Sequence, residues 1–177
     1  MAGFVNTFFE DRVDQLFDLA GLVEKIFSSA RLDYRIVGGL ATYLYVEEAG
    51  PDAGRLTRDI DIAAGSYGLS LRHVAGVDML VLAEQPSARR VVHLVFAGEK
   101  VRPEYLAAVP ALGPSKTIRG LQLIPLADLV RMKLTSFRAK DEAHLKDLDE
   151  AGLITPGIEA DLIPALASRL AQTRART

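Results

Sequence analysis

Apolar residues recur at helical spacing along the amino-terminal part of the chain. Between Phe4 and Ala30 they fall three or four positions apart, with acidic residues interleaved; the set is Phe8, Phe9, Val13, Leu16, Phe17, Ala20, Val23 and Phe27. An apolar stripe of this period is typical of an amphipathic helix that packs one face on a core. The pattern therefore predicts one or two helices here.

The pattern then changes to short β-prone runs separated by glycine. Residues 34–37 predict a strand that ends at the glycine pair 38–39, and residues 40–48 predict a helix. After a loop at 49–54, residues 59–62 alternate polar and apolar positions, as a half-buried strand does. The predicted order is strand, glycine turn, helix and acidic strand.

The middle of the chain is predicted to be sheet. Residues 71–74 and 77–82 flank Ala75-Gly76 like the arms of a hairpin, and residues 90–96 form a third strongly β-prone run. The stretch 63–70 is hardly long enough for a helix, whereas a parallel neighbour of the acidic strand needs a crossover of about a dozen residues or more. We therefore expect either an antiparallel neighbour or a trimmed fold.

The last third predicts a strand pair followed by helices, at residues 117–118, 121–123, 125–138, 141–151 and 156–170. Pro125 suits the first position of a helix, and residues 103–114 have the composition of a connecting loop. The expected fold class is α+β, with a mixed sheet flanked by an amino-terminal helix and a carboxyl-terminal helical region. We expect an α/β core at 1–124 and helices at 125–177, in one compact unit.

Composition narrows the function classes. A chain of 177 residues with 49% hydrophobic and 25% charged residues suits one globular domain. The absence of cysteine removes disulfides, thiolate metal sites and cysteine nucleophiles, and it fits a reducing compartment, so the cytoplasm is the expected location. No signal peptide or membrane span is expected. Because the net charge is -2, the chain as a whole does not attract nucleic acid, and a nucleic acid would have to be bound by a local basic patch such as Arg89-Arg90. Ordinary solvated surface charge is the simpler explanation of these two arginines.

The acidic strand carries the first candidate chemistry. Alternate side chains of a strand share a face, so Asp59 and Asp61 project together while Ile60 and Ile62 pack the other way. Mg²⁺ takes oxygen ligands and is commonly held by one or two carboxylates together with substrate phosphates. The pair is therefore a candidate metal site, and a strand with a solvated acidic face is the alternative.

The glycine pair strengthens the metal interpretation. Glycines at a strand-to-helix turn let backbone approach a phosphate closely, and the exposed amides at a helix start attract anions. Gly38 and Gly39 are therefore candidate phosphate-binding residues, next to the acidic pair. Turns also need glycine for ordinary conformational reasons, so the pair alone is a weak signal.

With these motifs the chain resembles the DNA polymerase beta-type nucleotidyltransferase superfamily. The match comprises Ile36-Val37-Gly38-Gly39 and Arg55-Leu56-Thr57-Arg58-Asp59-Ile60-Asp61-Ile62. Within that superfamily it is similar to the minimal bacterial members grouped with AbiEii-type toxins. Those proteins also carry a Met-Lys-Leu sequence and an Arg-x-Lys-Asp sequence. In this chain the two are Met132-Lys133-Leu134 and Arg138-Ala139-Lys140-Asp141, and Asp147 follows them. The resemblance implies Mg²⁺ or Mn²⁺ at Asp59 and Asp61 and a nucleoside triphosphate as substrate. It implies nucleotide binding by Gly38, Gly39, Thr57, Arg58, Lys133, Arg138 and Asp141.

Lys133 is also singled out by its helical position. It lies four residues from both Leu129 and Phe137, in the middle of an apolar stripe. A buried ammonium needs a carboxylate, a phosphate or a path to water. The resemblance favours a role in neutralising triphosphate or orienting an aspartate, and a structural ion pair is the alternative.

The pattern departs from the superfamily at its third carboxylate. The run that looks equivalent, 91–96, has His93 where an aspartate is expected. A neutral imidazole is a poor ligand for Mg²⁺, accepts Mn²⁺ or Zn²⁺, and is a competent general base near neutral pH. His93 is therefore a general base, a ligand to a softer metal or a buried structural histidine, with Asp78 as a replacement acid if the strand alignment is wrong.

Three functions follow from these residues. The first is metal-dependent transfer of a nucleoside monophosphate from a nucleoside triphosphate to a tRNA, a protein or a small molecule, with an antitoxin as a partner if the chain is a toxin. The second is a catalytically inactive nucleotide- or partner-binding member of the same fold. The third is a structural protein that binds neither metal nor nucleotide.

Overall fold

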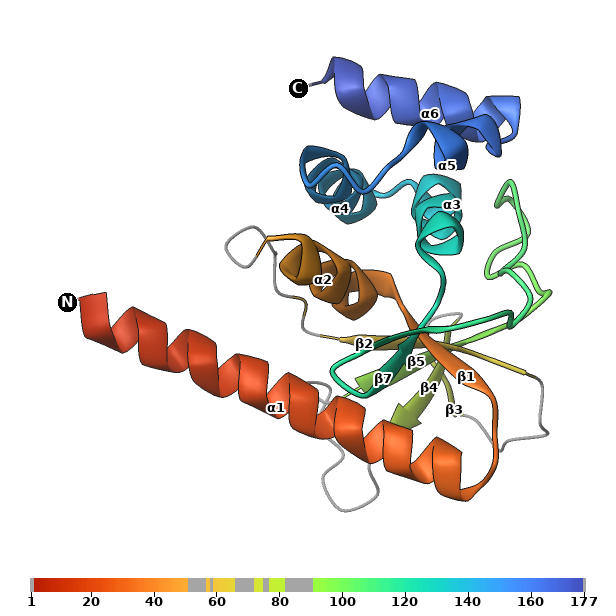
Figure 1. Cartoon of the computed structure of the whole chain (residues 1–177). Helices are drawn as coiled ribbons and strands as arrows, with labels where there is room; N and C mark the ends of the chain where they lie inside the picture. Colours follow the sequence, from red (N-terminus) through yellow and green to blue (C-terminus); the bar gives the residue numbers. More distant parts are fainter. Residues whose placement is uncertain are drawn as a thin grey trace.

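The computed structural model describes residues 2–50, 57, 59–65, 72–74, 77–81 and 91–176. Within them, seven strands form one mixed sheet in the order β3-β4-β5-β2-β1-β7-β6 (Figure 1). The strands are β1 (Tyr34–Val37), β2 (Ile60–Ala64), β3 (Arg72–Val74), β4 (Val77–Val81), β5 (Val91–Phe96), β6 (Lys116–Ile118) and β7 (Leu121–Leu123). The helices are α1 (Ala2–Ser29), α2 (Gly38–Ala49), α3 (Leu126–Ser136), α4 (Ala139–Glu150), α5 (Pro156–Ala160) and α6 (Pro164–Ala175).

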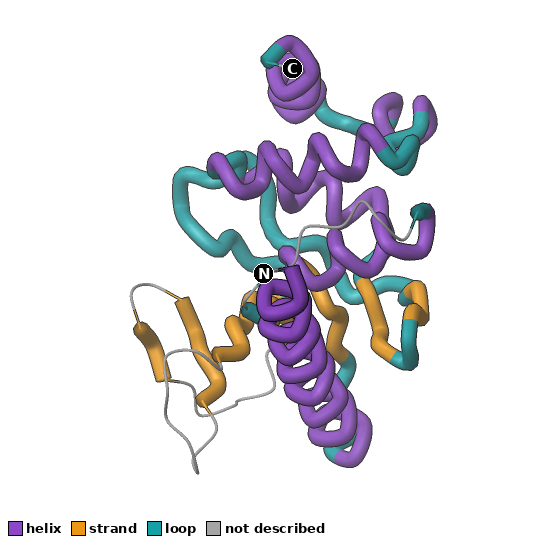
Figure 2. The backbone as a smooth tube through the Cα atoms, turned by 90° about the vertical axis from the view of Figure 1, so that its left-hand side faces the viewer, coloured by secondary structure: helices purple, strands orange, loops and turns teal. Residues whose placement is uncertain are grey.

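Helices cover the sheet on both faces. The long helix α1 runs along one side, and α2, α3, α4, α5 and α6 are stacked on the other (Figures 1 and 2). The ring of Phe27 in α1 packs at 5.1 Å, centroid to centroid, from the ring of Tyr34 in β1. Alternation along the central strands buries Ile36, Ile60 and Ile62 completely. The opposite face of the same strands carries the polar residues described below.

The acidic strand β2 has two different neighbours. It pairs antiparallel with β1, which places Val37 opposite Asp61, and parallel with β5, which places His93 opposite Asp61. The chain passes from β2 to its parallel neighbour through the antiparallel hairpin β3-β4, which lies outside β5 in the sheet. A hairpin therefore replaces the crossover helix, which explains why the stretch after β2 is too short for one.

The α+β class, with a mixed sheet between an amino-terminal helix and carboxyl-terminal helices, is confirmed, but one predicted element was wrong. The predicted helix at 156–170 is divided into α5 and α6, and α6 continues to Ala175. The cause is Pro164, which removes a backbone donor and restricts the residue before it; Ile163 is extended, with φ -63° and ψ 151°. No described helix is both long and apolar enough to cross a membrane.

Candidate functional site

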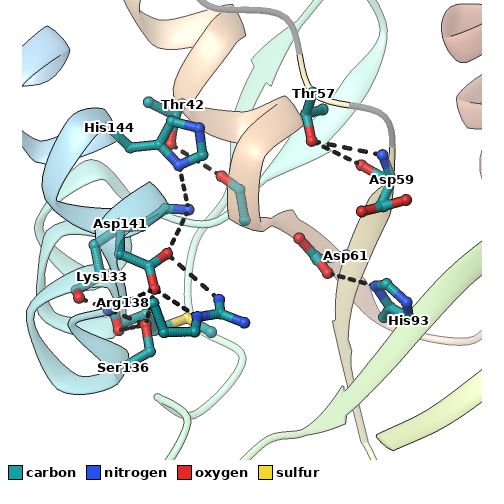
Figure 3. A network of polar contacts seen from close by, with 12 residues as sticks. Thr42, Thr57, Asp59, Asp61, His93, Lys133, Ser136, Arg138, Asp141 and His144 are labelled. Carbon is teal, nitrogen blue, oxygen red and sulfur yellow. Dashed lines mark hydrogen bonds and ion pairs between the residues drawn. The ribbon is translucent and has the colours of Figure 1, made fainter. Parts of the chain in front are cut away.

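The candidate site is centred on Asp61, near the start of β2. The parallel register brings His93 of β5 beside it, and the distance between His93 Nδ1 and Asp61 Oδ1 is 3.0 Å (Figure 3). About a quarter of each side chain is exposed, 26% for Asp61 and 27% for His93. The register of β2 and β5 therefore shows the expected alignment of His93 with the acidic strand. On the other side of β5, the residue of β4 opposite His93 is Met79 and not Asp78.

The two partners shift each other's pKa in opposite directions. Burial alone would raise the pKa of Asp61, but the hydrogen bond and charge of His93, with help from Lys133 and Lys140, hold it below the ordinary value. The hydrogen bond to Asp61 raises the pKa of His93 despite the opposing effect of burial, and the charge of Asp59 adds to the rise. Asp61 is therefore ionised at neutral pH and His93 binds a proton more tightly than a free imidazole does.

Asp59 and Thr57 lie just before β2. The backbone amide of Asp59 and the hydroxyl of Thr57 are 3.5 Å apart, and the same hydroxyl lies 3.5 Å from the carbonyl of Asp59. The side chain of Asp59 is drawn at the end of the strand, above those of Asp61 and His93 (Figure 3). Arg58, the predicted nucleotide-binding residue between them, lies outside the described residues, as do Arg89 and Arg90.

The glycine pair at the start of α2 makes room for this acidic segment. Gly38 adopts φ +67°, and a Cβ atom there would stand 1.8 Å from Asp61 Oδ2. A Cβ atom on Gly39 would stand 2.5 Å from Thr57 Oγ1. Both glycines therefore have a packing reason to lack a side chain, in addition to the phosphate contact that remains a prediction for them.

Lys133 approaches the site from α3. It is buried in the apolar stripe of the helix, with 4% of its surface exposed. Its Nζ lies 2.9 Å from Nδ1 of His144 and 3.4 Å from Oδ1 of Asp141, both on α4. Burial lowers the pKa of Lys133, and the nearby carboxylates of Asp141 and Asp61 offset only part of that effect.

Asp141 is the most heavily bonded group beside the site. Its Oδ2 accepts hydrogen bonds from Ser136 Oγ at 2.8 Å, Arg138 Nε at 2.7 Å and the Arg138 backbone amide at 3.2 Å. Its side chain is 1% exposed. Burial by itself would raise the pKa of Asp141, but the bonds and charges of Arg138 and Lys133 lower it. The carboxylate therefore remains charged and fixes the start of α4 against the end of α3.

These groups line a cavity of about 170 Å³ between the sheet and the helices. Its charged and polar wall is formed by Gly38, Asp61, His93, Lys133, Thr135, Ser136, Arg138, Lys140 and Asp141. Its apolar wall is formed by Val37, Val95 and Met132 together with Val101, Tyr105 and residues 107–109 from the segment after β5. A ligand in the cavity would thus meet the acidic side chain of Asp61, several basic groups and an apolar surface.

The structure separates the predicted site residues into two groups. Gly38, Asp61, His93, Lys133, Arg138 and Asp141 line the one cavity, whereas Gly39, Thr57 and Asp59 are not among its described lining residues. Asp147 is buried on α4, away from that lining.

Two parts of the site could not be foreseen from motifs. His144 follows Asp141 by three residues, so the two share a face of α4, and this spacing was the available signal. Tyr105 and its neighbours lie in a segment without regular structure, where the sequence has no periodicity to interpret.

The residues fit a divalent cation of the kind that takes ligands from its substrate. Asp61 is ionised, and the absence of a side chain at Gly38 leaves room for its carboxylate beside the start of α2. Among the described residues, no group of three or more histidine, cysteine or acidic side chains converges to hold a metal. A cation beside Asp61 would therefore need further ligands from water or a substrate phosphate, as Mg²⁺ bound by one or two carboxylates does.

Comparison with known proteins supports the fold. No protein-family model and no curated protein matches the sequence. The structure is similar to that of an antigenic nucleotidyltransferase-like protein from Paracoccidioides brasiliensis, with a TM-score of 0.55 and 17% identity over 92% of this chain and 88% of that chain. It also matches the antibiotic-resistance factor ANT(2'')-Ia, with a TM-score of 0.43 and 10% identity over 93% of this chain and 85% of that one. The first likeness shows that this chain has a nucleotidyltransferase-like fold.

Proposed function

We propose that this chain is a metal-dependent nucleotidyltransferase that moves a nucleoside monophosphate from a nucleoside triphosphate to an acceptor. One observation carries the proposal: Asp61, His93 and the buried ammonium of Lys133 line the same cavity, together with Arg138. Negative groups for a cation and positive groups for phosphates are thus present within the space of one ligand. Nucleotidyl transfer depends mainly on positioning and on electrostatic stabilisation, so a small scaffold is adequate for it.

The transfer step forms one bond and breaks one. An acceptor oxygen or nitrogen attacks the α-phosphorus, the bond from that phosphorus to the bridging oxygen breaks, and pyrophosphate leaves with the electron pair. Mg²⁺ or Mn²⁺ held by Asp59 and Asp61 would neutralise charge on the phosphates. Lys133 and Arg138 would supply positive charge to the polyphosphate from the wall of the cavity.

His93 is placed to take the proton of the acceptor. If its Nδ1 carries the proton and donates it to Asp61, then Nε2 is left with a free electron pair. The carboxylate then orients the ring and stabilises the imidazolium that forms, as an aspartate does in other acid-base pairs. This arrangement lets an imidazole perform the task for which a third carboxylate is the expected group.

A second candidate function rests on the same histidine. An inactive member of the fold would bind nucleotide without turnover, and the observation in its favour is that Asp61 already has a partner in His93. In that case the histidine satisfies the charge of Asp61 in place of a metal. The two functions differ in whether the nucleoside monophosphate is transferred to an acceptor, because nucleotide binds in both.

The acceptor and partners are proposed on the sequence resemblance alone. The similarity to AbiEii-type toxins makes a tRNA or a protein the first acceptors to test, with an antitoxin as the partner, while small molecules form a third class. The apolar wall around Tyr105 would contact the part of the acceptor or nucleotide that carries no charge.

A labelling experiment tests the proposal. The protein is incubated with each nucleoside triphosphate, labelled at the α-phosphate, in Mg²⁺ and separately in Mn²⁺, with total tRNA, cell protein or a small-molecule mixture. We expect label from the α-phosphate to appear on an acceptor, and a parallel reaction with γ-labelled triphosphate to leave the acceptor unlabelled. Asp61→Asn should abolish the transfer. Asp149→Asn, which lies outside the cavity lining, should not. Nucleotide binding without transfer under all conditions would replace the proposal with the inactive alternative.

A further inference from the structure

The ammonium of Lys133 is held by a neutral group as well as by a charged one. Its nearest partner is Nδ1 of His144, at 2.9 Å, and Asp141 Oδ1 is farther away, at 3.4 Å. The Asp141 carboxylate is also engaged by Arg138, whose Nε approaches to 2.7 Å, and by Ser136. The charge of Asp141 is therefore shared among several donors, and the closest contact of Lys133 is with an imidazole.

The chemistry of this contact fixes the state of His144. An ammonium has only protons to offer, so Nδ1 must accept, and the imidazole must therefore be neutral with its proton on Nε2. Burial and the positive charge of Lys133 lower the pKa of His144 to about 4, which keeps the ring neutral at physiological pH. Lys140 adds further positive charge in the same direction, while Asp141 and Asp61 oppose it.

A neutral acceptor has a consequence that a carboxylate would not have. Because Asp141, at 3.4 Å, already offsets part of the Lys133 charge, a neutral His144 holds Nζ through a hydrogen bond and cancels none of the remaining positive charge. That charge stands at the wall of the cavity that Asp61 and Arg138 also line. A carboxylate at residue 144 would hold the same atom but would neutralise the field that attracts an anion.

We propose that His144 is a positioning residue that aims the Lys133 ammonium at the polyphosphate while preserving its charge. The inference rests on the proposed function, because it assumes that a polyphosphate enters this cavity. It adds to that function a residue on α4 which touches no substrate and acts through Lys133. The Lys133–His144 contact would thus serve phosphate binding, whereas Asp141, which also contacts Lys133, holds α3 and α4 together.

Three variants separate position from charge. His144→Asn keeps a neutral acceptor near the place of Nδ1, His144→Leu removes the acceptor, and His144→Asp replaces it with a carboxylate. Binding of inorganic tripolyphosphate is measured by calorimetry near pH 7.5 on proteins whose circular dichroism matches that of the wild type. We expect the Asn variant to bind within about threefold of wild type, and the Leu and Asp variants to bind at least tenfold more weakly, a tenfold change being about 1.4 kcal/mol.

A second readout follows Lys133 directly and needs no ligand. The pKa of its ammonium is measured from the Cε chemical shift in each variant. We expect His144→Asp to raise that pKa, because a negative charge stabilises the ammonium, and His144→Leu to lower it, because a hydrogen bond to the charged form is lost. His144→Asn should leave it close to the wild-type value. If the Leu variant does not fold, the comparison of Asn with Asp still decides the matter.

The outcomes distinguish this inference from the proposed function. If the wild type binds tripolyphosphate and all three variants bind it equally, His144 has no positioning role and the inference is overturned. Equal weakening in the Asn and Asp variants would overturn the claim about charge. If the wild type does not bind tripolyphosphate, the proposed function fails, whereas unchanged Lys133 titration in all variants would overturn the His144 contact itself.

Discussion

The carboxylate of Asp61 occupies the space that a side chain at Gly38 would need. A Cβ atom on Gly38 would stand 1.8 Å from Asp61 Oδ2, and the backbone there has φ +67°. The acidic strand β2 and the start of α2 therefore approach each other at a distance that only glycine permits. This contact joins the two motifs that the sequence presents separately, the glycine pair and the acidic pair.

Gly38→Ala is expected to destabilise the protein by more than backbone strain alone. A left-handed conformation costs a residue with a side chain about 1–2 kcal/mol, and the overlap with Asp61 adds to that cost. Gly98 is the matched control, since it has φ +82° and no atom within 4 Å of an added Cβ. Urea unfolding should therefore show a clearly larger loss for Gly38→Ala than for Gly98→Ala. Equal losses would mean that the close approach of Asp61 is not real.

Asp141→Asn is expected to be among the most destabilising polar substitutions. The carboxylate is buried and accepts bonds from Arg138, Ser136 and Lys133, so the amide leaves a buried ammonium without its counter-charge. Removing one partner of a buried pair costs about 3–5 kcal/mol. Asp149→Asn is the control, because its partner Arg174 is exposed and such pairs are worth less than about 1 kcal/mol. Similar unfolding free energies for the two variants would contradict the buried network.

The neutral state of His144 predicts a dependence of stability on pH. Its pKa is lowered to about 4 in the folded protein, whereas an unfolded histidine titrates near 6.5. Between these two pKa values the unfolded chain binds one more proton than the folded protein. The contribution of neutral His144 to the free energy of unfolding is therefore complete above about pH 6.5 and is lost as the pH falls toward about 4. One proton corresponds to a slope of at most about 1.4 kcal/mol per pH unit. His144→Asn should flatten this part of the unfolding profile, and an unchanged slope would show that residue 144 does not titrate this way.

Replacing His93 is expected to change the choice of metal. An imidazole beside Asp61 disfavours Mg²⁺ relative to Mn²⁺, whereas a carboxylate in the same register restores an all-oxygen site. His93→Asp should therefore raise the affinity for Mg²⁺ in the presence of nucleotide and reduce the preference for Mn²⁺. Competition between the two ions can be followed through the electron paramagnetic resonance of free Mn²⁺. An unchanged preference would place His93 outside the metal environment.

Local patterns predicted most of the elements, because alternation and glycine turns are properties of adjacent residues. The alignment of His93 with Asp61 was expected only through family resemblance, since pairing between strands β2 and β5 depends on contacts across the sheet. The hairpin that joins these two strands shows why the short connection after β2 still permits a parallel pair. Periodicity found the inward-facing Lys133 but not its nearest partner.

His144 shows why the remainder could not be predicted. Its role depends on the angle at which α4 packs on α3, and a sequence does not specify that angle. The same holds for Tyr105, which reaches the cavity from a segment with no regular structure. The break at Pro164 was within reach of local rules, since a proline ends or restarts a helix.

The position of a bound metal would show whether Asp61 holds the cation that the proposed reaction needs. A crystal of the protein with Mn²⁺ and a non-hydrolysable nucleoside triphosphate analogue gives the metal position from its anomalous scattering. We expect a peak in direct contact with the Asp61 carboxylate and with a phosphate oxygen, and the remaining phosphates beside Lys133. A peak elsewhere, or a nucleotide bound away from Asp61 and Lys133, would contradict it.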